Sequence, residues 1–254
     1  AALFAPSWSL IDPWFGGQAA GALTLWLILL LMIAGTPFVD GVGTNSGMPI
    51  GFAVLALTIQ NIAMVAVTYA YVRWRYRLSL DDIGLHWPPT RSQIRTGILL
   101  GIGLLIIGGL AEAGVKAVGD AMLPAHVKTA VERLSGAMSA GGLLADARPS
   151  PLAFLGLAFA ASIAAPVGEE VFFRGFLHNC TRRRFGPGLG TLLSAGCFAA
   201  VHGGPLMILA ILPMGIILAW AYDRTGSLWV PILMHGFNNG VLSIVVALNP
   251  GMAR

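Results

Sequence analysis

Charged side chains are scarce in this sequence. Only 10% of its 254 residues are Asp, Glu, Lys or Arg, whereas a soluble globular domain carries about 25%. Lys116 and Lys128 are the only lysines, and Cys180 and Cys197 the only cysteines. So little charge excludes a soluble enzyme and a nucleic-acid-binding protein. The two cysteines lack metal-ligand spacing and exclude a disulfide scaffold.

Long hydrophobic runs take the place of the missing charges. Hydrophobic residues make up 56% of the chain. A bilayer core about 30 Å thick needs about 20 apolar helical residues to cross it, and most uncharged intervals reach that length. These intervals lie between Asp12 and Asp40, Asp40 and Arg73, Arg95 and Glu112, Arg148 and Glu169, Arg184 and Asp223, and Arg224 and Arg254. We therefore expect an all-α fold, a polytopic transmembrane helical bundle of seven to eight transmembrane helices.

Seven spans are predicted, and the helix-breaking triplet at 203–205 separates the fifth from the sixth. They cover residues 18–35, 50–72, 96–113, 152–181, 188–203, 206–222 and 228–247. Residues 113–150 do not resemble a transmembrane span. In this segment apolar residues recur at helical spacing among charged residues, at Val127, Val131, Leu134 and Met138. This pattern favours an amphipathic helix on the outer surface, with an eighth span as the alternative. Residues 1–150 and 151–254 are expected to form one integrated membrane domain, with the chemistry in the second part.

The arginines predict the orientation of the bundle. They gather in the loops after spans two, four and six, at residues 73–77, 91–95, 182–184 and 224. Cytoplasmic loops of membrane proteins are rich in Lys and Arg. These loops are therefore predicted to be cytoplasmic, with the amino terminus inside and the carboxyl terminus outside. The net charge of +4 reflects this topology and indicates no nucleic-acid partner.

Ionisable residues inside the later spans are the candidate functional groups, because each costs about 2.5–3.5 kcal/mol on insertion. Glu170 and Arg174 are four residues apart on one helical face, which predicts a buried ion pair. Glu169 lies about 140° further round the helix from Arg174. It is either a general base activated by burial or a group that hydrogen-bonds a neighbouring helix.

Span seven offers a pair of hydrogen-bond donors. His235 and Asn239 share a face and suit a developing oxyanion, although Asn238 remains an alternative by geometry. At 1.5 Å per residue, Glu169 and His202 each lie about 20 Å, and His235 about 15 Å, from the arginine-rich border. Three separate helices thus bring costly polar groups to a similar depth, which indicates one shared site.

At these residues the sequence resembles a known family. Residues 169–175 (EEVFFRG), 198–202 (FAAVH) and 235–239 (HGFNN) match the EExxxR, FxxxH and HxxxN motifs of the CAAX protease and bacteriocin-processing (CPBP/ABI) family. Its members are intramembrane glutamic endopeptidases similar to CAAX prenyl endopeptidases. The resemblance covers about residues 150–245.

The resemblance implies a role for each motif residue. Glu169 and His202 would activate the attacking water, His235 and Asn239 would line the oxyanion hole, and Glu170 and Arg174 would support them. No cofactor is expected, because the family is regarded as metal-independent and no HExxH motif is present. A zinc ion held by Glu169, His202 and His235 is the alternative.

The implied partners are the lipid bilayer and a peptide or protein substrate, prenylated or leader-type. The implied location is a prokaryotic cell membrane, as a multi-pass protein whose site is reached from the cytoplasmic side. A non-catalytic membrane partner, such as a bacteriocin-immunity or scaffold protein, is the alternative function. A transporter with Glu169 as proton carrier is a third, but the repeated halves common in transporters are absent from the sequence.

Overall fold

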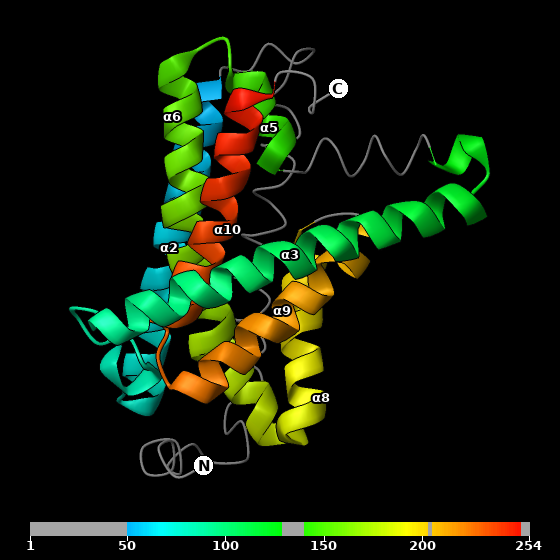
Figure 1. Cartoon of the computed structure of the whole chain (residues 1–254). Coiled ribbons are helices and arrows are strands. Elements are labelled where there is room, and N and C mark those ends of the chain that lie inside the picture. Colours follow the sequence, from blue (N-terminus) through cyan, green and yellow to red (C-terminus); the bar gives the residue numbers. More distant parts are fainter. Residues whose placement is uncertain (1–49, 129–139, 203–204, 250–254) are drawn as a thin grey trace.

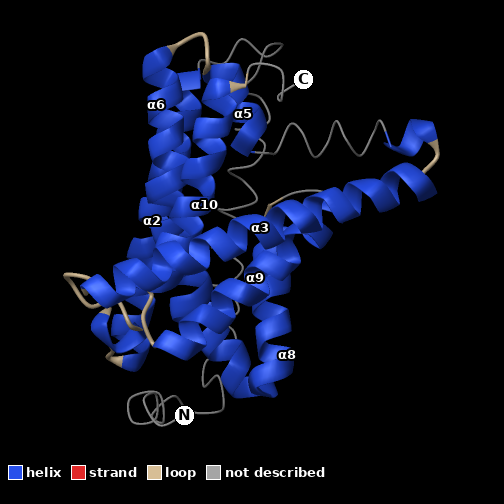
Figure 2. Ribbon diagram, in the orientation of Figure 1, coloured by secondary structure: helices blue, strands red, loops and turns tan. Residues whose placement is uncertain are grey.

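The computed structural model describes residues 50–128, 140–202 and 205–249, and every regular element among them is a helix (Figure 1, Figure 2). Five helices there are long and apolar enough to cross a membrane: Ile50–Trp74, Arg91–Met122, Pro151–Ala200, Leu206–Thr225 and Trp229–Leu248. The predicted all-α transmembrane bundle is confirmed. The first predicted span, 18–35, lies outside the described residues.

Helices α2 (Ile50–Tyr76) and α3 (Arg91–Met122) are joined by a loop that contains the short helix η2 (Asp81–Ile83). Gly84 follows η2 with φ of 90°, a left-handed conformation that favours glycine. The carbonyl of Gly84 accepts a hydrogen bond from the Leu228 amide at 2.9 Å. This bond ties the loop to the turn before the last helix. Backbone and side-chain hydrogen bonds from Ser79 hold the pKa of Asp82 in this loop below its ordinary value.

Helix α3 is longer than the predicted span 96–113. It begins with a capping box, in which Thr90 and Gln93 satisfy each other's backbone amides. It then continues to Met122 and lies obliquely across helices α9 (Pro205–Thr225) and α10 (Trp229–Leu248) (Figure 1). Residues 113–122, predicted as part of a separate amphipathic segment, therefore extend α3, because no proline interrupts the chain before Pro124.

The rest of the predicted amphipathic segment is described only at its edges. Val131, Leu134 and Met138 lie outside the described residues, so the outer-surface helix and the eighth span stay predictions. The chain is described again from α5 (Ala140–Ala147).

Residues 151–200 form a continuous series of helical elements with one sharp reversal. The series is α6 (Pro151–Phe159), η3 (Ala160–Ala164), α7 (Ala165–Glu170), η4 (Val171–His178) and α8 (Asn179–Ala200). Elements η3 and η4 are wider π-helical turns. Within α8 the backbone leaves the helix at Gly186, with φ of 81°, just before Pro187. The chain reverses there, which confirms the predicted break between spans four and five.

The two arms of this hairpin touch near its tip. The Thr181 hydroxyl donates to the Gly190 carbonyl at 2.8 Å. A side chain at Gly190 would collide with the backbone of Arg182. Glycine at this position therefore allows the two arms to pack closely.

The last helices, α9 (Pro205–Thr225) and α10 (Trp229–Leu248), complete the bundle. Helix α10 packs against α3 and also against η3 and α7, while α9 packs against α8. On the other side of α7, Gly168 faces Asn61 of α2 with no room for a Cβ atom. The segment that carries Glu169 and Glu170 is thus enclosed between α2 and α10.

Candidate active site

The predicted ion pair between Glu170 and Arg174 is confirmed. Arg174 Nη1 donates to Glu170 Oε1 at 2.9 Å, and Nη2 donates to the Gly215 carbonyl of α9 at 3.0 Å. Both ionised side chains are fully buried. Removing one partner of such a pair strongly destabilises the folded protein, because the remaining charge stays buried without a countercharge. The pair therefore anchors η4 to α9 beneath the candidate site.

His235 joins this pair from α10, a contact that the sequence did not predict. Its Nδ1 lies 3.0 Å from Glu170 Oε1. Because a carboxylate accepts, Nδ1 carries the hydrogen, which leaves Nε2 as the ring nitrogen available to a ligand. Only 5% of His235 is exposed. Glu170 thus fixes both the orientation and the protonated nitrogen of this ring.

Glu169 and His202 lie together as predicted from their common depth. Glu169 Oε2 is 3.5 Å from His202 Nε2, longer than an ordinary hydrogen bond. The Nδ1 atom of His202 donates to the Phe198 carbonyl at 2.6 Å, so Nε2 is the nitrogen that faces the carboxylate. Within the described residues Glu169 Oε2 is buried without a hydrogen-bond partner. Such a carboxylate oxygen beside a histidine nitrogen suits the binding and deprotonation of a water molecule.

Phe198 packs among the residues of both pairs. The Arg174 guanidinium lies 4.3 Å from the centre of its ring. The rings of His202 and His235 have centroids 4.5 Å and 5.8 Å from it. The motif match gives Phe198 no separate role, although its i,i+4 spacing to His202 indicates a contact. The aromatic ring therefore positions both histidines relative to the buried arginine.

Asn239 lies apart from these contacts. Its Nδ2 donates to the Ala161 carbonyl in η3 at 2.8 Å, and its Oδ1 accepts from Asn238 Nδ2 at 3.3 Å. In the described part of the chain no hydrogen bond joins Asn239 to Glu169, His202 or His235. Its place in an oxyanion hole stays a prediction, as does the alternative role of Asn238.

The zinc alternative finds no ligand cluster in the described ranges. Glu169, His202 and His235 were the candidate ligands, but no group of three His, Cys, Asp or Glu side chains there is arranged to hold a metal ion. The Nδ1 atoms of both histidines are bonded to protein oxygens. The expectation of no cofactor stays a prediction.

A second polar network lies at the end of the bundle that holds the arginine-rich loops. His178 of η4 is fully buried in it. Its Nε2 lies 3.1 Å from Asp223 Oδ1, which also pairs with Arg182 at 2.5 Å. Helix α9 covers this side chain, and the carboxylate of Asp223 gives its Nε2 atom a polar partner.

Comparison with known proteins identifies the region around the site. Residues 151–241 match the family described as type II CAAX prenyl endopeptidase Rce1-like. This match contains all six candidate residues and confirms the resemblance expected from the three motifs.

Three curated relatives cover the same part of the chain. The putative membrane peptidase YdiL of Bacillus subtilis is 30% identical over 89 residues, which are 35% of this chain and 36% of YdiL. The membrane-embedded CAAX protease MroQ of Staphylococcus aureus is 36% identical over 98 residues, 36% of this chain and 40% of MroQ. The UPF0177 protein in the abiGi 5' region of Lactococcus lactis is 36% identical over 88 residues, 34% of this chain and 37% of that protein. The chain thus spans two fifths or less of the length of these relatives. No solved structure matches significantly.

Proposed function

We propose that this protein is an intramembrane endopeptidase of the glutamic type. The observation that carries the proposal is the meeting of Glu169 with His202 at 3.5 Å, beside a histidine held by Glu170 at 3.0 Å. The two pairs come from three helical segments, and the aromatic ring of Phe198 contacts both histidines. The match of residues 151–241 to CAAX endopeptidases supports a peptidase reaction.

The first step is the activation of water between Glu169 and His202. The carboxylate of Glu169 takes a proton from the water as its oxygen attacks the carbonyl carbon of the scissile bond. His202 holds that water through Nε2, because Nδ1 is engaged by the Phe198 carbonyl. Glu169 then delivers the proton to the leaving amine as the carbon–nitrogen bond breaks. This step needs no metal ion.

The second requirement is stabilisation of the oxyanion. We assign this role to Nε2 of His235 and to the amide of Asn239. A ring that already donates from Nδ1 to Glu170 donates from Nε2 only when both nitrogens are protonated. Glu170 accepts from Nδ1 at 3.0 Å and so fixes the direction in which Nε2 points. Asn239 has a second N–H beyond the one bonded to Ala161.

The substrate in this proposal is a membrane-associated peptide or protein, prenylated or leader-type, cleaved on the cytoplasmic side of a bacterial cell membrane. Two observations support the location. The three relatives described above, which share the motif region, are bacterial proteins. The arginine-rich loops gather at one end of the bundle, where the Gly84 carbonyl bonds the Leu228 amide and the Ile83 carbonyl accepts from Tyr222.

The test is a comparison of peptide termini in membranes that express wild type, Glu169→Gln or Glu112→Gln at equal levels. Glu112→Gln is the matched control, because Glu112 is an exposed carboxylate of α3 outside the site. Glu169→Gln is expected to remove the new termini made by wild type, with a rate loss of at least about 100-fold. Retained cleavage by folded Glu169→Gln would refute the mechanism. Termini that are identical in all samples would favour the non-catalytic alternative of an immunity or scaffold protein.

A further inference from the structure

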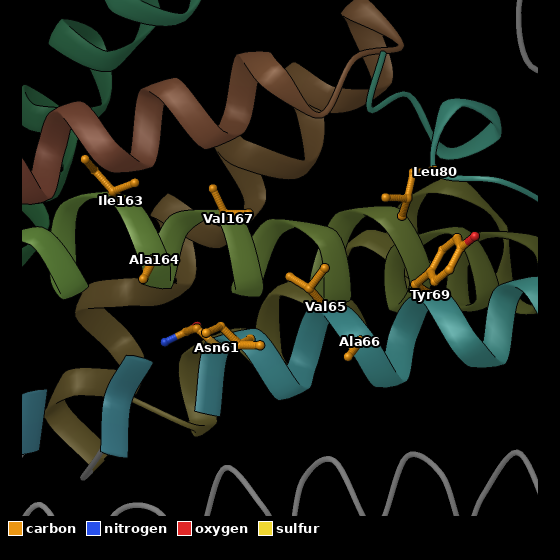
Figure 3. A pocket seen from close by; sticks show the side chains of 9 residues that line it. Asn61, Val65, Ala66, Tyr69, Leu80, Ile163, Ala164 and Val167 are labelled. Carbon is orange, nitrogen blue, oxygen red and sulfur yellow. The ribbon is translucent and has the colours of Figure 1, made fainter. Parts of the chain in front are cut away.

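An apolar groove lies on the side of α7 away from the candidate site. Its volume is about 460 Å³, and it runs between α2 and the segment 163–167 (Figure 3). Its walls are formed by Asn61, Ile62, Val65, Ala66, Tyr69, Leu80, Ile163, Ala164 and Val167. Glu169 is two residues beyond Val167, about 200° further round the helix. The groove is therefore separate from the water-activating pair.

The length of the groove corresponds to part of one leaflet. From Asn61 to Tyr69 the helix rises about 12 Å, against about 15 Å for half of the hydrocarbon core. Tyr69 and Leu80 form the end nearest the arginine-rich loop (Figure 3). Arg73 follows Tyr69 by one helical turn on the same face of α2. With Arg73 at the predicted membrane border, the groove extends from that border toward the middle of the bilayer.

Positive charge lies beside this open end. Arg73 and Arg77 are both exposed, and the Arg73 guanidinium contacts the Arg77 carbonyl at 3.4 Å. The carboxylates of the adjoining loop have other partners. Asp82 accepts two hydrogen bonds from Ser79 at 2.8 Å, and Asp81 lies 3.5 Å from His86. These hydrogen bonds do not cancel the carboxylate charges, which lie in the loop after Leu80. Arg73, one turn beyond Tyr69 on α2, is therefore the cationic group that continues the groove's own face.

We propose that the groove binds one acyl chain of an anionic phospholipid, with the lipid phosphate at Arg73. The apolar walls match the acyl chain, and the guanidinium at the mouth matches the phosphate. An extended peptide fits less well, because its backbone N–H and C=O groups would lie unpaired against apolar walls. A helix about 10 to 12 Å wide is too broad to enter a groove of this volume and length.

The lipid preference is measured by native mass spectrometry of the full chain in detergent. The protein is titrated separately with phosphatidylglycerol and with phosphatidylcholine of the same acyl chains. Wild type is expected to retain phosphatidylglycerol about fivefold more tightly, since one arginine near an anionic headgroup contributes about that factor. Proteolytic activity is not a readout, so the result is independent of the proposed function.

Three variants locate the binding site. Ala66→Trp fills the groove from an exposed position and is expected to lower retention of both lipids. Arg73→Gln is expected to remove the preference for phosphatidylglycerol, with a smaller loss of phosphatidylcholine retention, because the choline of that headgroup offsets the phosphate charge. Ile98→Trp is the matched control, because Ile98 is an exposed residue of α3 outside the groove.

Unchanged retention by Ala66→Trp, with its helical circular dichroism intact, would overturn the proposal. Equal retention of the two lipids by wild type would also overturn it. The absence of any retained lipid in wild type would overturn it as well, and would favour residues 1–49 or a peptide as the occupant of the groove.

Discussion

Single buried residues decide the chemistry that is open to this bundle. Glu170 is fully buried, and one of its oxygens contacts both Arg174 and His235. A buried carboxylate with a cationic partner is electrically balanced. Glu170 is therefore suited to hold Arg174 and His235 in place. Glu169 has the adjacent position in the sequence, yet it is hydrogen-bonded to none of these groups in the described residues. The two neighbouring glutamates therefore differ in chemical environment because their side chains leave the helix about 100° apart.

The buried pair can be tested through stability. Arg174→Gln leaves Glu170 without its full countercharge and is expected to lower the free energy of unfolding by about 3–5 kcal/mol. The double variant Glu170→Gln/Arg174→Gln should lose less than the sum of the single variants, because neither charge is then left alone. Denaturation in detergent measures this. Additive losses would contradict the ion-pair interpretation.

The two neighbouring asparagines provide an internal comparison for the proposed oxyanion hole. Asn239→Ala is expected to lower kcat by about 100- to 1000-fold with little effect on KM. Asn238→Ala should change kcat far less, because it removes only a hydrogen bond to Asn239. A thermal melt of each variant serves as the control, since Asn239 also bonds the Ala161 carbonyl. Equal kcat losses in both variants would contradict the assignment to Asn239.

At the scale of the elements, tight helix reversals bring the motif residues together. The hairpin within α8 turns at Gly186 and closes where Gly190 meets Arg182. Its second arm carries Phe198 and leads to His202. The position of His202 relative to Glu169 therefore depends on how closely the two arms pack.

Two glycines in this hairpin distinguish the effect of close packing between the arms from the effect of helix propensity. Gly190→Val is expected to destabilise the protein by about 1–3 kcal/mol or more, because its side chain meets the Arg182 backbone. Gly188→Val is the control, since no atom outside the local helix lies within 4 Å of its Cβ position. Melting temperatures in detergent compare the two. A larger loss in Gly188→Val would contradict this account of the hairpin.

At the scale of the whole molecule, the loops that carry most of the arginines meet at one end. The loop 77–90 contacts the turn at 226–228 through Gly84 and Leu228. Tyr222 joins the Ile83 carbonyl to Asn179 of α8. The charge pattern predicted that these loops share one side of the membrane, and their contacts agree. Which side that is stays a prediction.

The orientation can be measured with introduced cysteines. Ser79→Cys and Asn249→Cys lie in the arginine-rich loop and after the end of α10. With the loop cytoplasmic, a membrane-impermeant maleimide should label Asn249→Cys in intact cells, and Ser79→Cys only after lysis. The unsubstituted chain, which has Cys180 and Cys197, is the labelling control. The reverse pattern would show the opposite orientation.

Much of this architecture follows from local patterns in the sequence. Uncharged runs predicted the described spans. In a bilayer the backbone N–H and C=O groups of an apolar run must hydrogen-bond within the run, which favours a helix. The i,i+4 spacing predicted the Glu170–Arg174 pair, since it depends on one helix alone. The end of α3 was less predictable, because residues 113–122 combine charged, apolar and glycine residues without a proline that would mark a boundary.

Contacts between distant segments needed the folded chain. The sequence by itself determined the membrane bundle, the charged end and the ion pair, and it predicted that Glu169, His202 and His235 lie at a similar depth. Only the tertiary structure decided that His235 bonds Glu170, that Phe198 contacts both histidines and that His178 is buried against Asp223. Helical spacing specifies which face a residue occupies on its own helix. The partner of that face depends on how helices rotate and approach one another, which packing at positions such as Gly168 and Gly190 determines.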